Sequence, residues 1–231
     1  MTESRSKLSD LLDGVDALLF DFDGPLCDVF AGLLAPDVAR ELERLAGREF
    51  ETDDPLEVVR LCYDNLSPAV ARRVEDALIE FEIKAVSMST TEAAGVRALR
   101  NGRAAGLDIA VVTNNATQAA EAFLVDQSVR PLVSIVVGRA FRRPDLMKPH
   151  PWPLRRALDE LGVAARRAVL IGDSRTDIEA SRATGVRCVA FANRPGKREE
   201  FEAAGAAVVV DDMGELADVL EQDDIRRTGL A

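Results

Sequence analysis

The sequence predicts an α/β protein with a doubly wound parallel sheet as its core and an α-helical cap inserted after the first strand. Short, continuously apolar runs alternate with segments of helical period along most of the 231 residues. Residues 28–90 interrupt this alternation and carry helical period alone. Strands covered on both faces read as continuous apolar runs, and βα alternation is typical of doubly wound sheets. The composition, 47% hydrophobic and 30% charged, is that of an ordinary globular protein.

The expected strands are short apolar runs, most of which end at polar residues. They cover residues 17–21, 109–113, 132–137, 168–172, 187–191 and 207–210. Because most of these runs do not alternate between apolar and polar residues, we expect both faces of the sheet to be covered.

Helices are expected between the strands. Leu154, Leu158 and Leu161 follow the spacing i, i+4, i+7, and Gly162 behind them is a helix-stop signal. Further helical segments are predicted at residues 92–105, 117–125, 177–183 and 198–204. The polar residues 222–231 predict a frayed tail.

The interrupting segment contains three amphipathic stripes and no convincing strand. The stripes run over residues 38–45, 56–63 and 70–81. We therefore predict a core domain of residues 1–27 and 91–231, and a helical cap domain of residues 28–90.

Charge and cysteine content narrow the class of protein. The net charge of −11 and the pI near 4.7 oppose binding to nucleic acid or to anionic membranes. No stretch of eighteen uncharged apolar residues is present, which predicts a cytoplasmic protein. Cys27, Cys62 and Cys188 are odd in number and lack CxxC spacing, so neither a disulfide framework nor a zinc site is expected. The oligomeric state stays open between monomer and homodimer.

Polar residues that could take part in catalysis or in ligand binding lie at the carboxyl ends of three of the predicted strands. Asp21, Asp23 and Gly24 follow the first, Thr113 and Asn114 the second, and Asp173 and Asp177 the fourth, while Lys148 lies in a proline-rich loop. Ligands of doubly wound sheets bind beyond the carboxyl ends of the strands, so these residues are expected to meet there.

The four aspartates predict a cation at this edge. Neighbouring carboxylates at 4 Å repel by roughly 4 kcal/mol at an effective dielectric near 20, and a bound cation offsets that repulsion. Carboxylate oxygens favour Mg²⁺, whereas zinc is disfavoured because the chain has a single histidine. Taken one at a time, each polar residue could instead be an ordinary turn or helix cap.

In this order, the segments DFDG, VVTNN, KPHP and GDSRTD resemble the four motifs of the haloacid dehalogenase superfamily. The resemblance extends roughly from Leu18 to Asp212, and the helical insertion is similar to that of the cap-bearing subgroup that includes phosphoglycolate phosphatase and β-phosphoglucomutase. It implies a Rossmann-like core and a phosphatase that hydrolyses a small phosphorylated metabolite, a phosphomonoester, through an aspartyl-phosphate with Mg²⁺ as cofactor.

The resemblance also implies roles for the aspartates. Asp21 is expected to be the nucleophile and a metal ligand. Asp23 is expected to act as general acid and base, and its backbone carbonyl as a metal ligand. Asp173 completes the metal site. Asp177 either binds the metal directly or lies behind it, where it would orient metal-bound water or Lys148.

The remaining motif residues are expected to contact the phosphoryl group. Thr113 offers a hydroxyl and Asn114 a backbone N–H, while Lys148 supplies positive charge to the nucleophile and to the substrate. Gly24 allows close backbone approach. The neighbouring Pro25 departs from the commoner family pattern, which has threonine or valine there.

Three alternatives to this function were considered. A phosphomutase would retain its intermediate, but the histidine which that family carries after the first motif is absent. Asp23 argues against a haloacid dehalogenase. A catalytically silent binding module is disfavoured because Asp21, Lys148 and Asp173 are all present.

The identity of the phosphomonoester stays open because the cap carries no motif. Cationic side chains of the cap are candidates for contacting a second anionic group of the substrate; they are Arg60, Arg72, Arg73 and Lys84. His150 is interpreted as a loop residue rather than as a base.

Overall fold

A parallel sheet forms the centre of the molecule. The computed structural model describes the backbone of residues 3–228 and the side chains of residues 4–222. Within that part of the chain, a six-stranded sheet has the order β5-β4-β1-β6-β7-β8, with every pair parallel. Its strands are β1 (Ala17–Phe20), β4 (Asp108–Val112), β5 (Ile135–Val137), β6 (Ala168–Gly172), β7 (Arg187–Phe191) and β8 (Val208–Val210). The predicted doubly wound sheet is confirmed, and its strand order reverses at β1.

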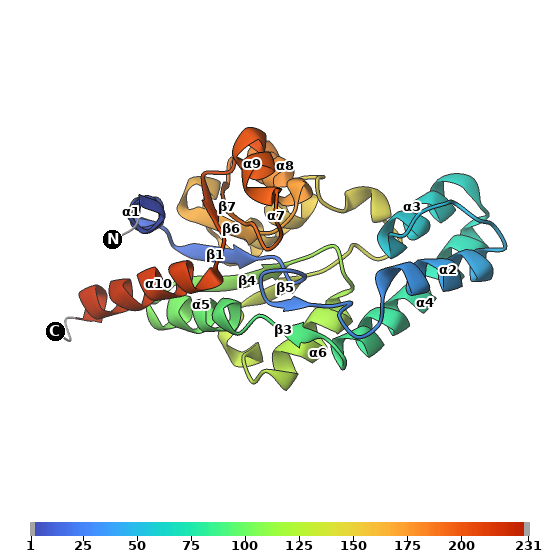
Figure 1. Cartoon of the computed structure of the whole chain (residues 1–231), viewed down its shortest axis with the longest axis horizontal. Coiled ribbons are helices and arrows are strands. Elements are labelled where there is room, and N and C mark those ends of the chain that lie inside the picture. The colour runs from blue at the N-terminus through green and yellow to red at the C-terminus, as the bar shows by residue number, and fades with distance from the viewer. Residues whose placement is uncertain (1–2, 229–231) are drawn as a thin grey trace.

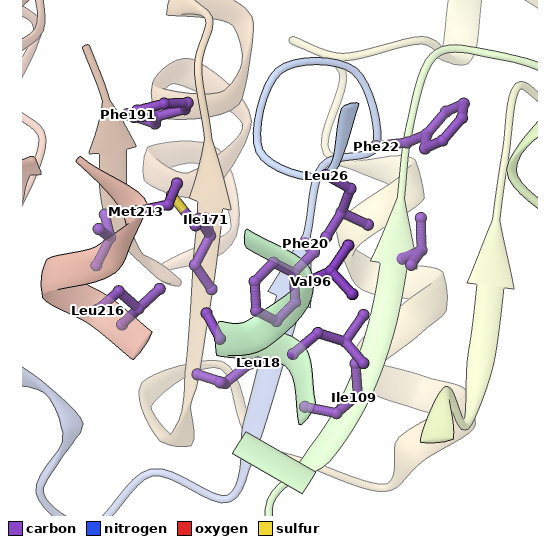
Figure 2. Packing of buried hydrophobic residues seen from close by; sticks show 14 of the residues in the cluster. Leu18, Phe20, Phe22, Leu26, Val96, Ile109, Ile171, Phe191, Met213 and Leu216 are labelled. Carbon is purple, nitrogen blue, oxygen red and sulfur yellow. The ribbon is translucent and has the colours of Figure 1, made fainter. Parts of the chain in front are cut away.

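Helices cover both faces of this sheet (Figure 1). On one face lie α5 (Ala93–Ala104), α6 (Thr117–Asp126) and α10 (Met213–Thr228); α1 (Glu3–Leu12) joins the same cluster. On the other face lie α7 (Trp152–Leu161), α8 (Arg175–Thr184) and α9 (Lys197–Ala204). Side chains of a strand alternate between the faces, so Leu18 and Phe20 pack into the first layer and Leu19 into the second. Figure 2 shows Leu18 and Phe20 in the first of these layers.

Helices α2 (Ala35–Ala46), α3 (Pro55–Asn65) and α4 (Pro68–Val86), here called the helical insertion, extend from one end of the sheet (Figure 1). Their starts follow from local chemistry. The side chains of Asp54 and Ser67 cap α3 and α4, and each helix has proline in its first turn. Apolar stripes of the three helices meet in a hydrophobic cluster that includes Leu42, Val59 and Leu78. The insertion therefore has a small core of its own.

The observed elements differ from the predicted ones mainly at short segments. Strands β2 (Cys27–Asp28) and β3 (Thr90–Thr91) form an antiparallel pair at the base of the insertion, where no strand is predicted. Two residues are too few to show a period. Helices α1 and α10 are not predicted either. The predicted tail at residues 222–231 is wrong as far as Thr228, which ends α10, and residues 229–231 lie outside the described part.

Two further findings concern the class of protein. Among the described residues, no helix is both long enough and apolar enough to cross a membrane. Cys27, Cys62 and Cys188 are buried free thiols.

Candidate functional site

The motif residues gather at the carboxyl edge of the sheet. Asp21 follows β1, Thr113 follows β4 and Asp173 follows β6, and β1 pairs with both neighbours. These residues line a cleft of about 1080 Å³, whose opposite wall comes from α3 and from the loop before Lys148. The predicted convergence at the point where the strand order reverses is therefore observed.

Asp21 lies at the bottom of the cleft with 7% of its surface exposed. Its Oδ1 accepts a hydrogen bond from the backbone N–H of Phe22 at 2.7 Å, and Lys148 Nζ lies 2.9 Å from its Oδ2. Burial raises the pKa of Asp21 well above its usual range, and the nearby Asp177 raises it further, against the opposing effect of Lys148. Lys148 and the Phe22 N–H therefore do not fully stabilise the negative charge of the Asp21 carboxylate.

Lys148 is held between two carboxylates. Its Nζ contacts Asp177 Oδ1 at 2.6 Å, Asp21 Oδ2 at 2.9 Å and the carbonyl of Val112 at 3.0 Å. Burial alone lowers the pKa of Lys148, but Asp177 and Asp21 more than reverse this, and the net pKa lies above its usual value. Lys148 therefore remains a cation beside Asp21.

The Asn114 side chain fixes the backbone of this lysine. Its Nδ2 donates to the Lys148 carbonyl at 3.0 Å, and its Oδ1 accepts from the Lys148 N–H at 2.7 Å. The Lys148–Pro149 peptide bond is cis. His150 lies in the same loop, where its Nδ1 accepts from the N–H of Trp152 at 3.1 Å, and it lines the cleft.

Asp177 contacts Lys148 and caps its own helix. Its Oδ2 accepts from the N–H of Ser174 at 3.1 Å, which completes a capping box at the start of α8. A Cβ on Gly172 would lie 2.4 Å from Asp177 Cγ, so glycine there makes room for this carboxyl group. Of the two orienting roles considered for Asp177, the contact with Lys148 is the one observed.

Asp173 is held by two residues that the sequence analysis missed. Its Oδ2 accepts from Asn193 Nδ2 and from Lys197 Nζ, both at 2.9 Å, and Lys197 also donates to its backbone carbonyl at 2.6 Å. Asn193 follows the carboxyl end of β7, so the rule that identified the other site residues could have found it.

The backbone of Gly24 lies close to the Asp173 carboxylate. Its φ is +98°, and a Cβ on Gly24 would lie 2.3 Å from Asp173 Cγ. Both the left-handed backbone and the lack of space therefore require glycine. The next residue, Pro25, has its carbonyl oxygen against Gly95 of α5, where a Cβ would lie 1.7 Å away.

Asp23 has the properties of a proton-transfer group. Its Oδ1 accepts from the N–H of Val29 at 3.0 Å. Burial, aided by the charge of Asp173, raises the pKa of Asp23 to about 6 although the Val29 hydrogen bond opposes the shift. A carboxyl group that titrates near neutrality is suited to general acid–base chemistry.

The carboxylates also fit a hard divalent cation. Oxygen atoms of Asp21, Asp173 and Asp177 lie within 4.8 Å of one another. The donors are all oxygens, which Mg²⁺ prefers. Burial, followed by the charges of Asp177 and Asp173, raises the pKa of Asp21 despite Lys148, and a bound cation would oppose that shift. Asp21 and Asp173 line the cleft, whereas Asp177 lies behind them with Oδ1 on Lys148 and Oδ2 on Ser174.

The hydroxyl of Thr113 is engaged within its own loop. Thr113 Oγ1 donates to Asn115 Oδ1 and accepts from the Asn115 N–H, both at 3.1 Å. Asn115 Nδ2 in turn donates to Glu82 Oε1 at 3.2 Å, and Glu82 pairs with Arg139. Glu82 and Arg139 were missed because a lone glutamate on a helix and a lone arginine in a loop resemble solvated charges.

Basic side chains line the far wall of the cleft. Of the four cations predicted as candidates there, Arg60 is among the described lining residues and Arg72, Arg73 and Lys84 are not. Each lining guanidinium is already paired with an acidic neighbour: Arg60 with Glu57, Arg142 with Asp76, and Arg143 with Asp145.

Comparisons with known proteins agree with this geometry. A family model described as haloacid dehalogenase-like hydrolase matches residues 18–191. The phosphoglycolate phosphatase of Rhodospirillum rubrum is 37% identical over 128 residues, which cover 54% of this chain and about half, 52%, of that protein. The phosphoglycolate phosphatase of Pseudomonas savastanoi pv. phaseolicola is 29% identical over 224 residues, covering 86% of this chain and 77% of the relative.

Solved structures show the same fold. The crystal structure of CbbY from Rhodobacter sphaeroides in complex with phosphate aligns with a TM-score of 0.69 and 22% identity, covering 87% of this chain and 96% of that one. Because the family model matches most of the chain and the four motifs meet at one edge of the sheet, the protein belongs to the haloacid dehalogenase-like hydrolase family.

Proposed function

We propose that the protein is a Mg²⁺-dependent phosphatase that hydrolyses a small phosphomonoester through an aspartyl-phosphate on Asp21. The observation that supports it most is the position of the Asp21 carboxylate, which lies at the bottom of the cleft beside the Lys148 ammonium and close to Asp173. Membership of a hydrolase family and relatives named phosphoglycolate phosphatase favour the same reaction.

In the first step, a carboxylate oxygen of Asp21 attacks phosphorus, and the bond from phosphorus to the ester oxygen breaks. Asp23 donates its proton to the departing alkoxide. In the second step, Asp23 takes a proton from water, the water oxygen attacks phosphorus, and the bond to Asp21 breaks to release phosphate. Two such steps replace one difficult displacement. The pKa of Asp23, near 6, suits both proton transfers.

The surrounding charges support these steps. Lys148 balances the charge of Asp21 and of the incoming phosphoryl group, and Asp177 keeps Lys148 in place. Asp21, Asp173 and the backbone carbonyl of Asp23 are the proposed Mg²⁺ ligands, with Asp177 behind them. Bound Mg²⁺ supplies positive charge that polarises the phosphoryl oxygens.

The helical insertion is proposed to act as a cap. We assign residues 28–90 to the cap domain and residues 1–27 and 91–231 to the core, as the periodicity predicts. The insertion has its own hydrophobic cluster and forms one wall of the cleft, which favours closure over a bound substrate. The end of α4 is an exception, because Ala85 packs in the core cluster.

Phosphoglycolate is the first substrate to test, given the names of the relatives. Its carboxylate would need a cation on the far wall. Arg60, Arg142 and Arg143 lie there, but each would have to share or leave an acidic partner. Esters with an uncharged leaving group need no cation on the far wall, so sugar phosphates and nucleoside monophosphates should be tested beside phosphoglycolate as one substrate panel. The acidic charge opposes nucleic acid as substrate.

The test is release of phosphate from p-nitrophenyl phosphate and from this panel, with Mg²⁺ and with EDTA. Asp21→Asn should abolish turnover. Asp108→Asn is the matched control, because Asp108 begins β4 at the opposite edge of the sheet. In H₂¹⁸O, label is expected in the released phosphate. Turnover that survives Asp21→Asn, or no turnover of any ester by the unchanged protein, would refute the proposal.

A further inference from the structure

A buried ion pair joins α4 to the core behind the loop of residues 113–116. Glu82 of α4 is fully buried, and the side chain of Arg139, which lies just after β5, is 1% exposed. Arg139 Nη1 lies 2.9 Å from Glu82 Oε1, and Nη2 lies 3.1 Å from Glu82 Oε2. This two-point geometry is the strong form of an arginine–carboxylate contact.

Both members of the pair hold the loop of residues 113–116. Glu82 accepts from Asn115 Nδ2 at 3.2 Å and from the N–H of Ala116 at 3.0 Å. Arg139 donates through Nη1 to the carbonyl of Asn114 at 2.9 Å and through its backbone N–H to the carbonyl of Asn115 at 2.8 Å. Successive residues of the loop are thus bound from one side.

The contact with Glu82 also determines how Asn115 and Thr113 are oriented. An ionised carboxylate only accepts hydrogen bonds, so Asn115 must turn its amide nitrogen toward Glu82. Its Oδ1 then faces Thr113 Oγ1, 3.1 Å away, and receives the hydroxyl proton. The direction of the Thr113 hydroxyl is therefore determined by a carboxylate on α4.

A buried ion pair is weak support for stability, because apolar residues of similar volume serve a core as well or better. Here the pair also satisfies two backbone groups and one amide of a single loop. We propose that Arg139 and Glu82 are positioning residues, which hold the Thr113–Ala116 loop in the geometry that binds the phosphoryl group. This inference rests on the proposed function, since it deepens the role of the same site.

The first variant is Glu82→Gln, which keeps the size of the side chain but has a single acceptor oxygen. Its NH₂ group would face N–H donors of Arg139 and of either Asn115 or Ala116. We expect kcat/KM for p-nitrophenyl phosphate to fall by about 10- to 100-fold, the cost of displacing a binding group by about 1 Å. KM and the inhibition constant of orthophosphate should rise together. Arg139→Lys keeps the charge without the two-point contact and should give an intermediate loss.

The control is Leu216→Ala in α10, a buried residue of the core cluster outside the cleft (Figure 2). It should lower the melting temperature while KM and the orthophosphate inhibition constant stay within about twofold of the unchanged protein, because loss of packing alone reduces the amount of folded enzyme. Glu82→Gln with a lowered melting temperature but unaltered KM and inhibition constant would overturn the proposal.

The double variant Glu82→Leu with Arg139→Met decides the case if Glu82→Gln does not fold. Its melting temperature should be close to that of the unchanged protein, while its kcat/KM should stay as low as that expected for Glu82→Gln. If both the melting temperature and kcat/KM match those of the unchanged protein, the pair is structural only. If the unchanged protein hydrolyses no ester, the proposed function fails. Orthophosphate binding followed by ³¹P NMR then tests the loop separately: equal binding by the unchanged protein and the double variant refutes positioning.

Discussion

The carboxyl edge of the sheet and the junction between α4 and the core both bury charged groups, but they differ in balance. At the edge, Asp21, Asp173 and Asp177 contact the ammonium groups of Lys148 and Lys197, and a fourth aspartate, Asp23, lies beside Asp173. At the junction, Glu82 pairs with Arg139, and the acceptors of Glu82 are satisfied from four donors. Glu75 lies beside this pair, against Arg139 and Arg142.

The difference teaches which cluster needs a ligand. The cluster at the edge opens to a cleft, where burial and then the neighbouring aspartates raise the pKa of Asp21 and of Asp23, so a cation and a phosphoryl group can complete it. The Glu82–Arg139 pair is closed to solvent, and the pKa of Arg139 is raised because Glu82 and Glu75 together outweigh the opposing effect of burial. Perturbed carboxyl groups beside a cleft are the mark of chemistry rather than of packing.

The largest expected effect is that of Asp21→Asn at the edge of the sheet, which should abolish activity without lowering stability. Asp21→Asn should lower kcat by at least about 10³-fold, the scale for loss of a nucleophile. The folded pKa of Asp21 is raised, so its carboxylate form costs stability above the unfolded pKa. In EDTA at pH 7 the variant should therefore unfold at the same urea concentration as the unchanged protein or at a higher one. A clear fall in that midpoint would contradict the raised pKa of Asp21.

At the junction between α4 and the core, loss of a charged side chain is expected to lower stability strongly. Arg139→Met leaves Glu82 buried without its cation, and the free energy of unfolding should fall by about 3–5 kcal/mol. Urea titration followed by circular dichroism measures it. Arg130→Met is the control, since Arg130 pairs with Glu121 at a partly exposed position and its loss should cost about 1 kcal/mol or less. Equal costs at the two sites would break the comparison.

Magnesium should stabilise the protein through the cluster at the edge alone. At 100 times its dissociation constant, Mg²⁺ should add about 2.7 kcal/mol to the free energy of unfolding, measured as a rise in melting temperature. Asp173→Asn should remove the rise, whereas Glu75→Gln at the junction should keep it. If Mg²⁺ still raises the melting temperature of Asp173→Asn, the metal binds at another site.

The smallest effect concerns two glycines with similar backbone angles. Gly24 and Gly205 have φ values of +98° and +91°, but a Cβ meets Asp173 only at Gly24, while nothing lies within 4 Å at Gly205. Each alanine substitution should cost about 1 kcal/mol of stability for the left-handed backbone. Only Gly24→Ala should also weaken the response to Mg²⁺, because it displaces Asp173. Identical magnesium titrations for the two variants would show that the clash is relieved elsewhere.

The residues that meet at the carboxyl edge of the sheet were readable from local sequence. Asp21, Thr113 and Asp173 follow apolar runs directly, and parallel strands carry such residues to one edge whatever the details of packing. Asn193 follows β7 in the same way and was overlooked. The two-residue strands β2 and β3 were out of reach, because a period needs several residues to show.

The sequence by itself determined the sheet, five of the helices that cover it and most of the residues that meet at its edge, because each rests on the period or the order of neighbouring residues. It did not indicate α1 or α10, which also pack on the sheet. Only the tertiary structure decided which charges are buried together. Glu82 and Arg139 lie 57 positions apart, and nothing near either residue indicates that packing of α4 on the core removes both from water. Desolvation depends on every neighbour in space, so the partners of a buried charge appear only once the chain is folded.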